Sequence, residues 1–291
     1  MADPGLVVVD KSAGMTSHDV VARVRRLAGT RKVGHAGTLD PMATGVLVLG
    51  VDRATRLLGH LILTEKSYDA TVRLGVTTTT DDAEGEVLEV SDIGAAWLQP
   101  GLVQTEFEEQ TGEILQVPTA VSAIKVDGKR AYQRVRDGEQ VELKARPVTV
   151  HDMVVHDQRV VGDLLDVDIS VRCSSGTYIR AIARDVGAAL HVGGHLTALR
   201  RTAVGPFDLS VARTLDELAD DFAVLPIADA ARATFASVDL DEEQAGHVRV
   251  GRALDLALPG EGPHAVFAPG GEFLALYEQR GQQARPVAVF V

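Results

Sequence analysis

A loop near the N-terminus brings together residue types that could do chemistry. Residues 34–45 read Gly-His-Ala-Gly-Thr-Leu-Asp-Pro-Met-Ala-Thr-Gly, with one carboxylate, Asp40, and one imidazole, His35. Pro41 restricts its own φ and biases Asp40 away from the helical conformation, while glycine lets a partner approach the main chain closely. The apolar residues 46–49 follow, as expected of a buried strand. The segment therefore predicts an aspartate presented on a constrained loop in front of a strand.

The whole pattern of this loop resembles a known motif. It matches Gly-His-x-Gly-x-Leu-Asp-Pro-x-Ala-x-Gly at every fixed position. That motif carries the nucleophilic aspartate of the bacterial TruB-type tRNA pseudouridine synthases. The resemblance implies that Asp40 is the catalytic nucleophile and that His35 helps to hold the tRNA loop open. An Asp-Pro pair without this context would indicate an ordinary turn, and His35 alone could be a polar loop residue.

Two further segments resemble motifs that build the active site of that family. Lys-x-Tyr followed by a strand implies that Tyr68 packs against the target base. Residues 173–180, Cys-Ser-Ser-Gly-Thr-Tyr-Ile-Arg, imply that Arg180 pairs with the nucleophilic aspartate and that Tyr178 lies against the nucleoside. A lone arginine in the first turn of a helix could also hold a phosphate, because a helix N-terminus binds anions.

The remaining resemblances concern the pocket and the RNA. Residues 193–207 are similar to the final motif of the family, in which Leu199 lines the pocket. Lys11 lies in a segment that resembles the first motif, with Ser12 in place of the usual proline; an ordinary surface lysine is the alternative. A segment at about 115–146 resembles the mobile insertion with which the family grips RNA. The basic residues expected to contact RNA there are Lys125, Lys129, Arg130 and Arg134.

Residue patterns predict the elements that carry these motifs. Residues 68–74 and 167–173 alternate apolar and polar side chains, which predicts two half-buried strands. Thr16 or Ser17 can cap a helix that Gly29 ends.

Two more helices are predicted close to the proposed site residues. Thr177 can cap a helix that carries Ile179, Ile182 and Val186 on one face. A basic helix is predicted over residues 129–136, although such a run is more often simply a solvated face.

Composition and charge restrict the class of protein. Of the 291 residues, 45% are hydrophobic and 24% charged, as in ordinary soluble proteins. Neither a signal peptide nor a run of about 20 apolar residues is present, so we expect no membrane contact and a cytoplasmic location. The single cysteine, Cys173, suits a reducing compartment, and no His/Cys cluster has metal-ligand spacing. We expect this cysteine to be structural, because a catalytic thiol is the rarer case.

Charge is distributed unevenly along the chain. The net charge of −12 argues against indiscriminate binding to nucleic acid. Residues 1–60 nevertheless carry eight Lys/Arg against five Asp/Glu, whereas residues 81–113 carry ten acids and no base. A basic face with an acidic back is compatible with RNA contact.

The patterns alone predict a mixture of helices and strands, and the resemblance adds the architecture. It implies an α+β fold with a mixed, mainly antiparallel central sheet flanked by helices and loops. After about residue 235, frequent Gly and Pro separate short apolar runs, which predicts a small β-rich module. With this boundary, the resemblance implies a catalytic domain over residues 1–234 and a PUA-like domain over residues 235–291. The latter carries eight acids and four bases from residue 236 on, so a role in RNA binding is weakly indicated.

The implied reaction restricts the chemistry. Conversion of uridine to pseudouridine breaks a C–N glycosidic bond and forms a C–C bond to the same sugar, so we expect no cofactor and no metal. The aspartate must stay ionised in a water-poor pocket, where burial raises a carboxyl pKa, and Arg180 is the candidate cation. His35, Tyr68 and Tyr178 could stack on a flipped base. Whether Asp40 attacks C1′ or C6, or abstracts a sugar proton, is left open, and Tyr68 is one candidate for the base that deprotonates C5.

The prediction is thus an isomerase that acts on the T-loop uridine, position 55, of tRNA. The expected partner is the T-arm stem-loop, with no guide RNA and with the protein as a monomer. A guide-dependent relative shares these motifs, but the lack of long basic tails favours a stand-alone enzyme. One alternative is a tRNA-folding chaperone that uses the same cleft. Another is a glycoside hydrolase, which would require a second carboxylate about 5–9 Å from the first, and no such motif accompanies Asp40.

Overall fold

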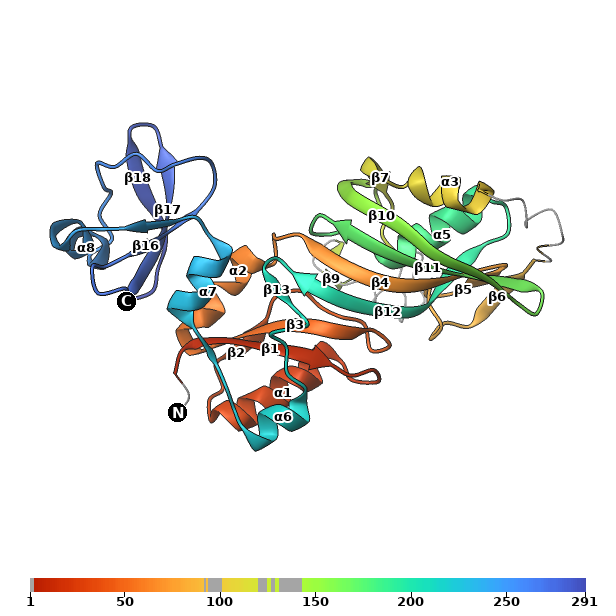
Figure 1. Ribbon diagram of the computed structural model, residues 1–291, viewed down its shortest axis with the longest axis horizontal. Coiled ribbons are helices and arrows are strands. Elements are labelled where there is room, and N and C mark those ends of the chain that lie inside the picture. Colours follow the sequence, from red (N-terminus) through yellow and green to blue (C-terminus); the bar gives the residue numbers. More distant parts are fainter. Residues whose placement is uncertain (1–2, 92, 94–100, 120–124, 127–128, 131–142) are drawn as a thin grey trace. The chain divides into compact units, whose positions relative to one another are not determined.

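Two compact units make up the chain. The computed structural model describes residues 3–91, 93, 101–119, 125–126, 129–130 and 143–291 (Figure 1). Unit 1 comprises Met1–Asp40, Val46–Ile62 and Val204–Val291, and unit 2 comprises Pro41–Gly45 and Leu63–Ala203. The first passage of the chain from one unit to the other is therefore the Asp40–Pro41 peptide bond.

The N-terminal part of unit 1 is built on short, mostly antiparallel strands. β1 (Gly5–Lys11) lies between β14 (Leu225–Pro226), with which it pairs antiparallel, and β3 (Thr44–Val51). β2 (Val33–His35) pairs antiparallel with β3. Four short helices and a short strand complete this part: η1 (Asp52–Arg56), α2 (Leu58–Leu61), β13 (Phe207–Asp208), α6 (Leu215–Asp220) and α7 (Ile227–Thr234).

The helix that precedes the Asp40 loop begins and ends as predicted. α1 (Ser17–Ala28) has Thr16 as its N-cap, and the side chains of Thr16 and Asp19 form a reciprocal capping box. Gly29 ends the helix in the left-handed conformation, with φ of 65°. These two local signals place Ser17, the first helical residue, at a defined position behind the loop.

The C-terminal module of unit 1 is a four-stranded sheet with one helix. β15 (Ser237–Asp239), β16 (His264–Phe267), β17 (Phe273–Arg280) and β18 (Gln283–Val289) lie in sequence order, and only the first pair is parallel. α8 (Glu242–Arg249) was not predicted, although Asp241 and Gln244 form a capping box at its start. The β-rich character of the module is confirmed.

This module shares a hydrophobic core with the N-terminal part of unit 1. The core cluster includes Leu6 and Val46 together with Phe267 and Phe290. Arg53 also donates a hydrogen bond of 3.1 Å to the carbonyl oxygen of Phe290. Residues on both sides of position 235 therefore stabilise one unit, and a domain boundary at this position stays a prediction.

Unit 2 is built on long antiparallel strands. Its strand order is β12-β4-β11-β10-β7, and β4 pairs antiparallel with β11, β11 with β10 and β10 with β7. Two small hairpins, β5–β6 and β8–β9, and the helices α3 and α5 accompany the sheet (Figure 1). The bounds are β4 (Lys66–Leu74), β5 (Val76–Thr78), β6 (Val87–Val90), α3 (Leu102–Glu108), β7 (Gly112–Gln116), β8 (Lys125–Val126), β9 (Lys129–Arg130), β10 (Arg146–Val161), β11 (Leu164–Cys173), α5 (Ile179–Ala189) and β12 (Gly194–Val204).

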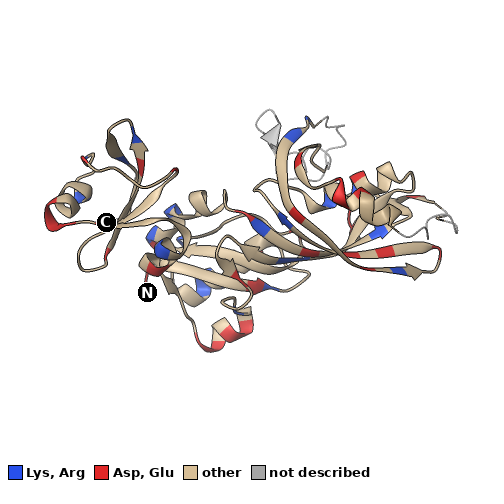
Figure 2. Ribbon diagram, turned by 45° about the horizontal axis from the view of Figure 1, so that its top comes forward, with Lys and Arg blue, Asp and Glu red and all other residues tan. Residues whose placement is uncertain are grey.

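The two faces of β4 and β11 differ in the way the predicted alternation requires. Alternate residues of both strands are buried, and α5 packs against β4. The other face carries cross-strand ion pairs, such as Arg73–Asp166 at 2.7 Å and Arg159–Asp168. Figure 2 shows basic and acidic residues along the long strands of this unit. The mixed, mainly antiparallel α+β fold predicted from the sequence is confirmed.

One predicted element is wrong. Lys129 and Arg130 were expected to begin a basic helix, but they form β9, which pairs antiparallel with β8, so that Lys125 faces Arg130 in the register. A residue that is paired in a strand cannot begin a helix at the same position. Arg134 and the rest of the predicted helix lie outside the described residues.

Candidate active site

Hydrogen bonds to a single buried serine hold the loop that carries Asp40. The Ser17 hydroxyl accepts from the Leu39 N–H at 2.9 Å and donates to the Leu39 carbonyl oxygen at 3.0 Å. On the other side of the loop, the Ala36 N–H donates to the Val48 carbonyl at 2.8 Å. Asp40, which is half-buried, therefore follows directly after an anchored residue. The sequence indicated Ser17 only as a possible helix cap, and its contact with a residue 22 positions away was not predicted.

Lys11 stabilises the turn that leads to this serine. Its side chain is 0% exposed, and its ammonium group donates to the carbonyl oxygens of Ser12 at 3.0 Å and Met15 at 2.7 Å. Burial of a lysine requires such partners. These contacts describe a structural role, and the predicted contact of Lys11 with RNA stays a prediction.

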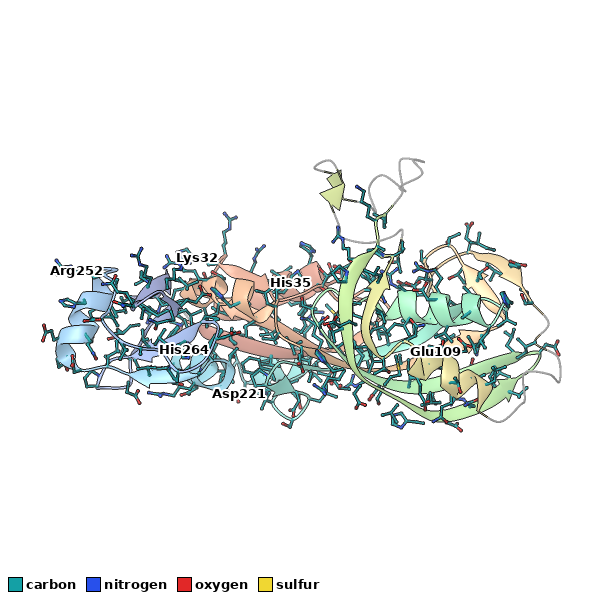
Figure 3. All side chains as sticks on the ribbon, turned by 90° about the horizontal axis from the view of Figure 1, so that it is seen from above. Lys32, His35, Glu109, Asp221, Arg252 and His264 are labelled. Atoms are coloured by element: carbon teal, nitrogen blue, oxygen red, sulfur yellow. The ribbon has the colours of Figure 1, made fainter. Side chains whose placement is uncertain are left out.

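His35 ends β2 and lies beside a second histidine. The rings of His35 and His18 meet edge to face, with centroids 5.8 Å apart and an interplanar angle of 82°. Figure 3 labels His35 and also Lys32, the residue just before β2. His35, Lys11 and Asp40 all belong to unit 1.

The end of the loop belongs to unit 2, where it joins the strand that carries Leu199. Thr44 and Gly45 pair in parallel with Arg200 and Arg201 of β12. Gly45 has φ of 98°, and a Cβ atom there would lie 2.2 Å from the Arg201 carbonyl oxygen, so only glycine allows this approach. Leu199 is buried one residue earlier on β12.

Tyr68 lies on the buried face of β4. Its side chain is 8% exposed, and its partner in the register on β11 is Val171. Lys66 is buried on the same face, two residues earlier, and donates to the Thr64 carbonyl at 2.8 Å. Burial, and to a smaller extent the nearby Arg201, lower the pKa of Lys66 to about 8.

The N-terminus of α5 differs in one detail from the prediction. The helix begins at Ile179 with Tyr178 as the N-cap residue, and Tyr178 makes no side-chain cap. Thr177, the predicted cap, donates instead to the Ser174 carbonyl at 3.0 Å. The backbone of Tyr178 is held by Gln116, whose side-chain oxygen accepts from the Tyr178 N–H at 2.8 Å.

Arg180 is buried beside a carboxylate of its own unit. It is 5% exposed, and its Nη1 atom donates to the Thr80 carbonyl at 2.8 Å and lies 3.4 Å from Oδ2 of Asp82. Asp82 is also buried and accepts from the Thr80 hydroxyl at 2.5 Å and the Glu84 N–H at 3.1 Å. From the sequence, the run Thr77–Asp82 indicated only a structural turn. Asp82 was therefore not predicted to be the partner of Arg180, and that run was the only feature of the sequence that marked it.

A second ion pair supports the same turn. Arg184 lies 3.5 Å from Asp81, and burial raises the pKa of Asp81 while Arg184 and Arg180 oppose that shift. The two carboxylates of the turn thus face two arginines of α5 that are four residues apart, on one side of the helix.

The structure groups the predicted site residues by unit. Tyr68, Tyr178, Arg180 and Leu199 lie in unit 2. The side chains of Lys125, Lys129, Arg130 and Arg134 lie outside what the structure describes.

Two general properties of the described ranges bear on the class of site. Within them, no three His, Cys, Asp or Glu side chains are grouped as they would be around a metal ion. None of the helices there is long and apolar enough to cross a membrane.

Comparison with protein families identifies the class. The family described as "TruB family pseudouridylate synthase (N terminal domain)" matches residues 25–179. Residues 180–233 match "tRNA pseudouridylate synthase B C-terminal domain", and residues 235–291 match "tRNA Pseudouridine synthase II, C terminal". The chain therefore belongs to the TruB family of pseudouridylate synthases.

Similar individual proteins extend over the whole chain. A protein of Arthrobacter sp. (strain FB24) named tRNA pseudouridine synthase B is 56% identical, over 98% of this chain and 96% of its own length. One of the same name from Thermobifida fusca (strain YX) is 58% identical, over 100% and 99%. Among solved structures, a Cbf5-Nop10-Gar1 complex contains a chain with a TM-score of 0.75 and 26% identity, matched over 99% of this chain and 85% of that one.

Proposed function

We propose that the chain isomerises the T-loop uridine at position 55 of tRNA to pseudouridine. Curated relatives that are 56–58% identical over nearly the whole chain are named tRNA pseudouridine synthase B, so the chain is an isomerase that modifies uridine in tRNA. The T-loop as the target comes from the resemblance of the site motifs. The observation that carries the proposal is Asp40, presented directly after Leu39, which Ser17 anchors on both its polar backbone groups.

Asp40 acts in this proposal on the target nucleotide, with Arg180 as its charge partner. A carboxylate in a water-poor pocket is protonated unless a cation stabilises it, and an arginine keeps its charge in almost any environment. The buried, hydrogen-bonded state of Arg180 supports this role, because its orientation is set before RNA binds. Attack at C1′, attack at C6 and abstraction of a sugar proton all require the same ionised Asp40.

The electron balance of the reaction needs only acid–base groups. The glycosidic C1′–N1 bond breaks and leaves its electron pair on N1, and a bond from C1′ to C5 forms. The proton on C5 leaves to a base, for which Tyr68 is the candidate, and N1 takes up a proton from solvent. The target uridine must first leave its stack, and aromatic stacking contributes about 1–3 kcal/mol per base. Tyr68, Tyr178 and His35 supply such rings, and Leu199 lines the apolar wall of the pocket.

The RNA partner in this proposal is the T-arm of tRNA, without a guide RNA. Lys125, Lys129, Arg130 and Arg134 grip its phosphates, and the chain acts as a monomer in the cytoplasm, where tRNA is processed. If a bare T-arm stem-loop were converted only after a second RNA had been added, the stand-alone activity would be disproved.

Release of tritium from [5-³H]uridine in a T-arm stem-loop tests the function directly. The wild-type protein should release one tritium per target uridine, because the hydrogen at C5 is lost in the isomerisation. Asp40→Asn should release none above background while still binding the RNA in a filter assay. Asp52→Asn, a change of the same type at a half-buried aspartate of unit 1, is the control and should be active. RNA binding by the wild type without any release would indicate a tRNA chaperone instead.

A further inference from the structure

A buried glutamine outside the predicted site holds the helix start that carries Tyr178 and Arg180. Gln116 is the last residue of β7 and is 2% exposed. Its Oε1 accepts from the Tyr178 N–H at 2.8 Å, and its Nε2 donates to the Tyr178 carbonyl oxygen at 3.1 Å. The amide thus bonds to both polar backbone groups of one residue, 62 positions further along the chain.

The start of α5 depends on this contact. The N-cap position usually holds a Ser, Thr, Asp or Asn side chain that satisfies the first helical N–H groups, but Tyr178 makes no such bond. Its carbonyl oxygen already accepts from Ala181 at 3.1 Å and Ile182 at 3.2 Å, which makes it the first acceptor of the helix. Gln116 therefore sets the peptide planes on both sides of Tyr178, and with them the direction in which α5 leaves the turn.

A second hydrogen bond ties the next residue of the same segment to α5. Arg184 donates to the carbonyl oxygen of Val117 at 2.7 Å. Arg180 lies one turn before Arg184, on the same side of the helix. The end of β7 thus holds the helix on both sides of Arg180 along its axis, while Thr80 and Asp82 hold the guanidinium itself.

We propose that Gln116 is a positioning residue for the isomerisation, acting through Tyr178 and Arg180 without touching the substrate. This inference depends on the proposed function, because it assigns Arg180 as the partner of Asp40 and Tyr178 as a contact of the nucleoside. Loss of the amide lets the first turn of α5 shift. A misplacement of about 1 Å in an active site can reduce the rate about 100-fold.

Three variants separate this role from a general loss of structure. Gln116→Met keeps the length of the side chain and removes both hydrogen bonds. Gln116→Glu keeps the acceptor for the Tyr178 N–H but, when ionised, places an oxygen against the Tyr178 carbonyl; when protonated, it restores both bonds. Gln104→Met is the matched control, because Gln104 makes a hydrogen bond of 2.8 Å to Glu108 on the exposed face of α3.

The measurement is the single-turnover rate of tritium release at saturating T-arm RNA, with the Kd for RNA and the melting temperature of each full-length variant. Gln116→Met should lower the rate about 10- to 100-fold, with a Kd within about twofold of wild type. Gln104→Met should match the wild type in all three. For Gln116→Glu, the rate relative to wild type should rise as the pH falls from 8 to 6, because burial favours the protonated carboxyl that mimics the amide.

The results for the Gln116 variants test the positioning role of Gln116, and the result for the wild-type protein tests the proposed isomerase activity. A wild-type rate for Gln116→Met, or a loss seen only in the Kd, would overturn the positioning role. If Gln116→Met did not fold, a pH-independent ratio for Gln116→Glu would overturn it equally. Failure of the wild-type protein to release tritium would instead disprove the proposed function, whatever the variants do.

Discussion

The loop that carries Asp40 and the helix start that carries Arg180 are held in different ways. Neutral hydrogen bonds anchor the loop: the Ser17 hydroxyl accepts from the Leu39 N–H and donates to the Leu39 carbonyl oxygen. At the start of α5 the neutral amide of Gln116 holds the backbone of Tyr178, whereas a charged group, the buried Asp82, lies beside the Arg180 guanidinium and in turn accepts from Thr80.

The difference follows from what each region presents. The anchor of the Asp40 loop binds the backbone of Leu39 and contributes no charge of its own. A buried arginine, in contrast, needs a counter-ion before any substrate arrives, because the desolvation of an unpaired charge costs several kcal/mol. The guanidinium of Arg180 is therefore held next to a counter-ion, whereas the residue before Asp40 is held by neutral hydrogen bonds alone.

The largest expected effect comes from removing the guanidinium of Arg180. Arg180→Met should reduce tritium release about 1000-fold or more, because it removes the cation that we propose stabilises Asp40. It should also destabilise the protein by about 3–5 kcal/mol, since Asp82 is left buried and unpaired. Single-turnover kinetics and thermal unfolding measure the two effects.

The double variant Arg180→Met/Asp82→Asn separates these two effects. It removes the unpaired charge, so the melting temperature should return most of the way to that of the wild type. Activity should stay lost. Recovery of activity together with stability would show that Arg180 serves the fold alone.

In unit 1, His35→Ala should weaken RNA binding more than it lowers the rate of the chemical step. Loss of one stacking ring should lower the affinity for the T-arm by about 1–3 kcal/mol, or about 5- to 150-fold. The rate at saturating RNA should change little. A titration of single-turnover rate against protein concentration gives both the affinity and the rate at saturation. Abolished turnover on a bound, flipped nucleotide would contradict the expectation that His35 only helps to hold the tRNA loop open.

Ser17→Ala tests the neutral anchor itself. Two hydrogen bonds of about 1 kcal/mol each are lost, and the loop before Asp40 gains freedom, so the rate should fall about 10-fold. Thr16→Ala, one residue earlier, removes the helix cap and should cost about 1 kcal/mol of stability with little loss of rate. Equal rates for the two variants would mean that Ser17 acts only through helix stability.

The smallest effect concerns Lys66, the buried lysine two residues before Tyr68. Its pKa falls from 10.5 to about 8 in the folded protein, so between these values the unfolded state binds more protons. Stability should therefore rise with pH above 8, by about 1 kcal/mol between pH 8 and 9, and Lys66→Met should abolish this rise. Urea unfolding at a series of pH values measures it. Above pH 9, Cys173 opposes the trend, because burial raises its pKa from 9.0 to about 11.

Local patterns in the sequence predicted the elements well. Alternation over residues 68–74 gave β4, and Thr16, Asp19 and Gly29 gave both ends of α1. Such signals depend on neighbours in the chain, whose contacts are decided by backbone geometry.

Contacts between distant polar side chains left no such signal. Ser17 and Leu39, Gln116 and Tyr178, and Arg180 and Thr80 are 22, 62 and 100 residues apart. Nothing periodic marks a residue that bonds across the fold. The basic helix predicted from Lys129 onward was wrong, because a run of charged residues indicates exposure but does not distinguish a helix from a strand.

The central claim is that Asp40 acts on a flipped uridine with Arg180 as its charge partner. A crystal structure of the protein with T-arm RNA that carries 5-fluorouridine at position 55 tests it most directly. We predict the modified nucleotide outside the RNA stack, with the Asp40 carboxylate facing C1′ or C6 and within about 3 Å of the Arg180 guanidinium. A nucleotide that stays stacked in the loop, or an Arg180 bound to Asp82 alone and remote from Asp40, would contradict the account.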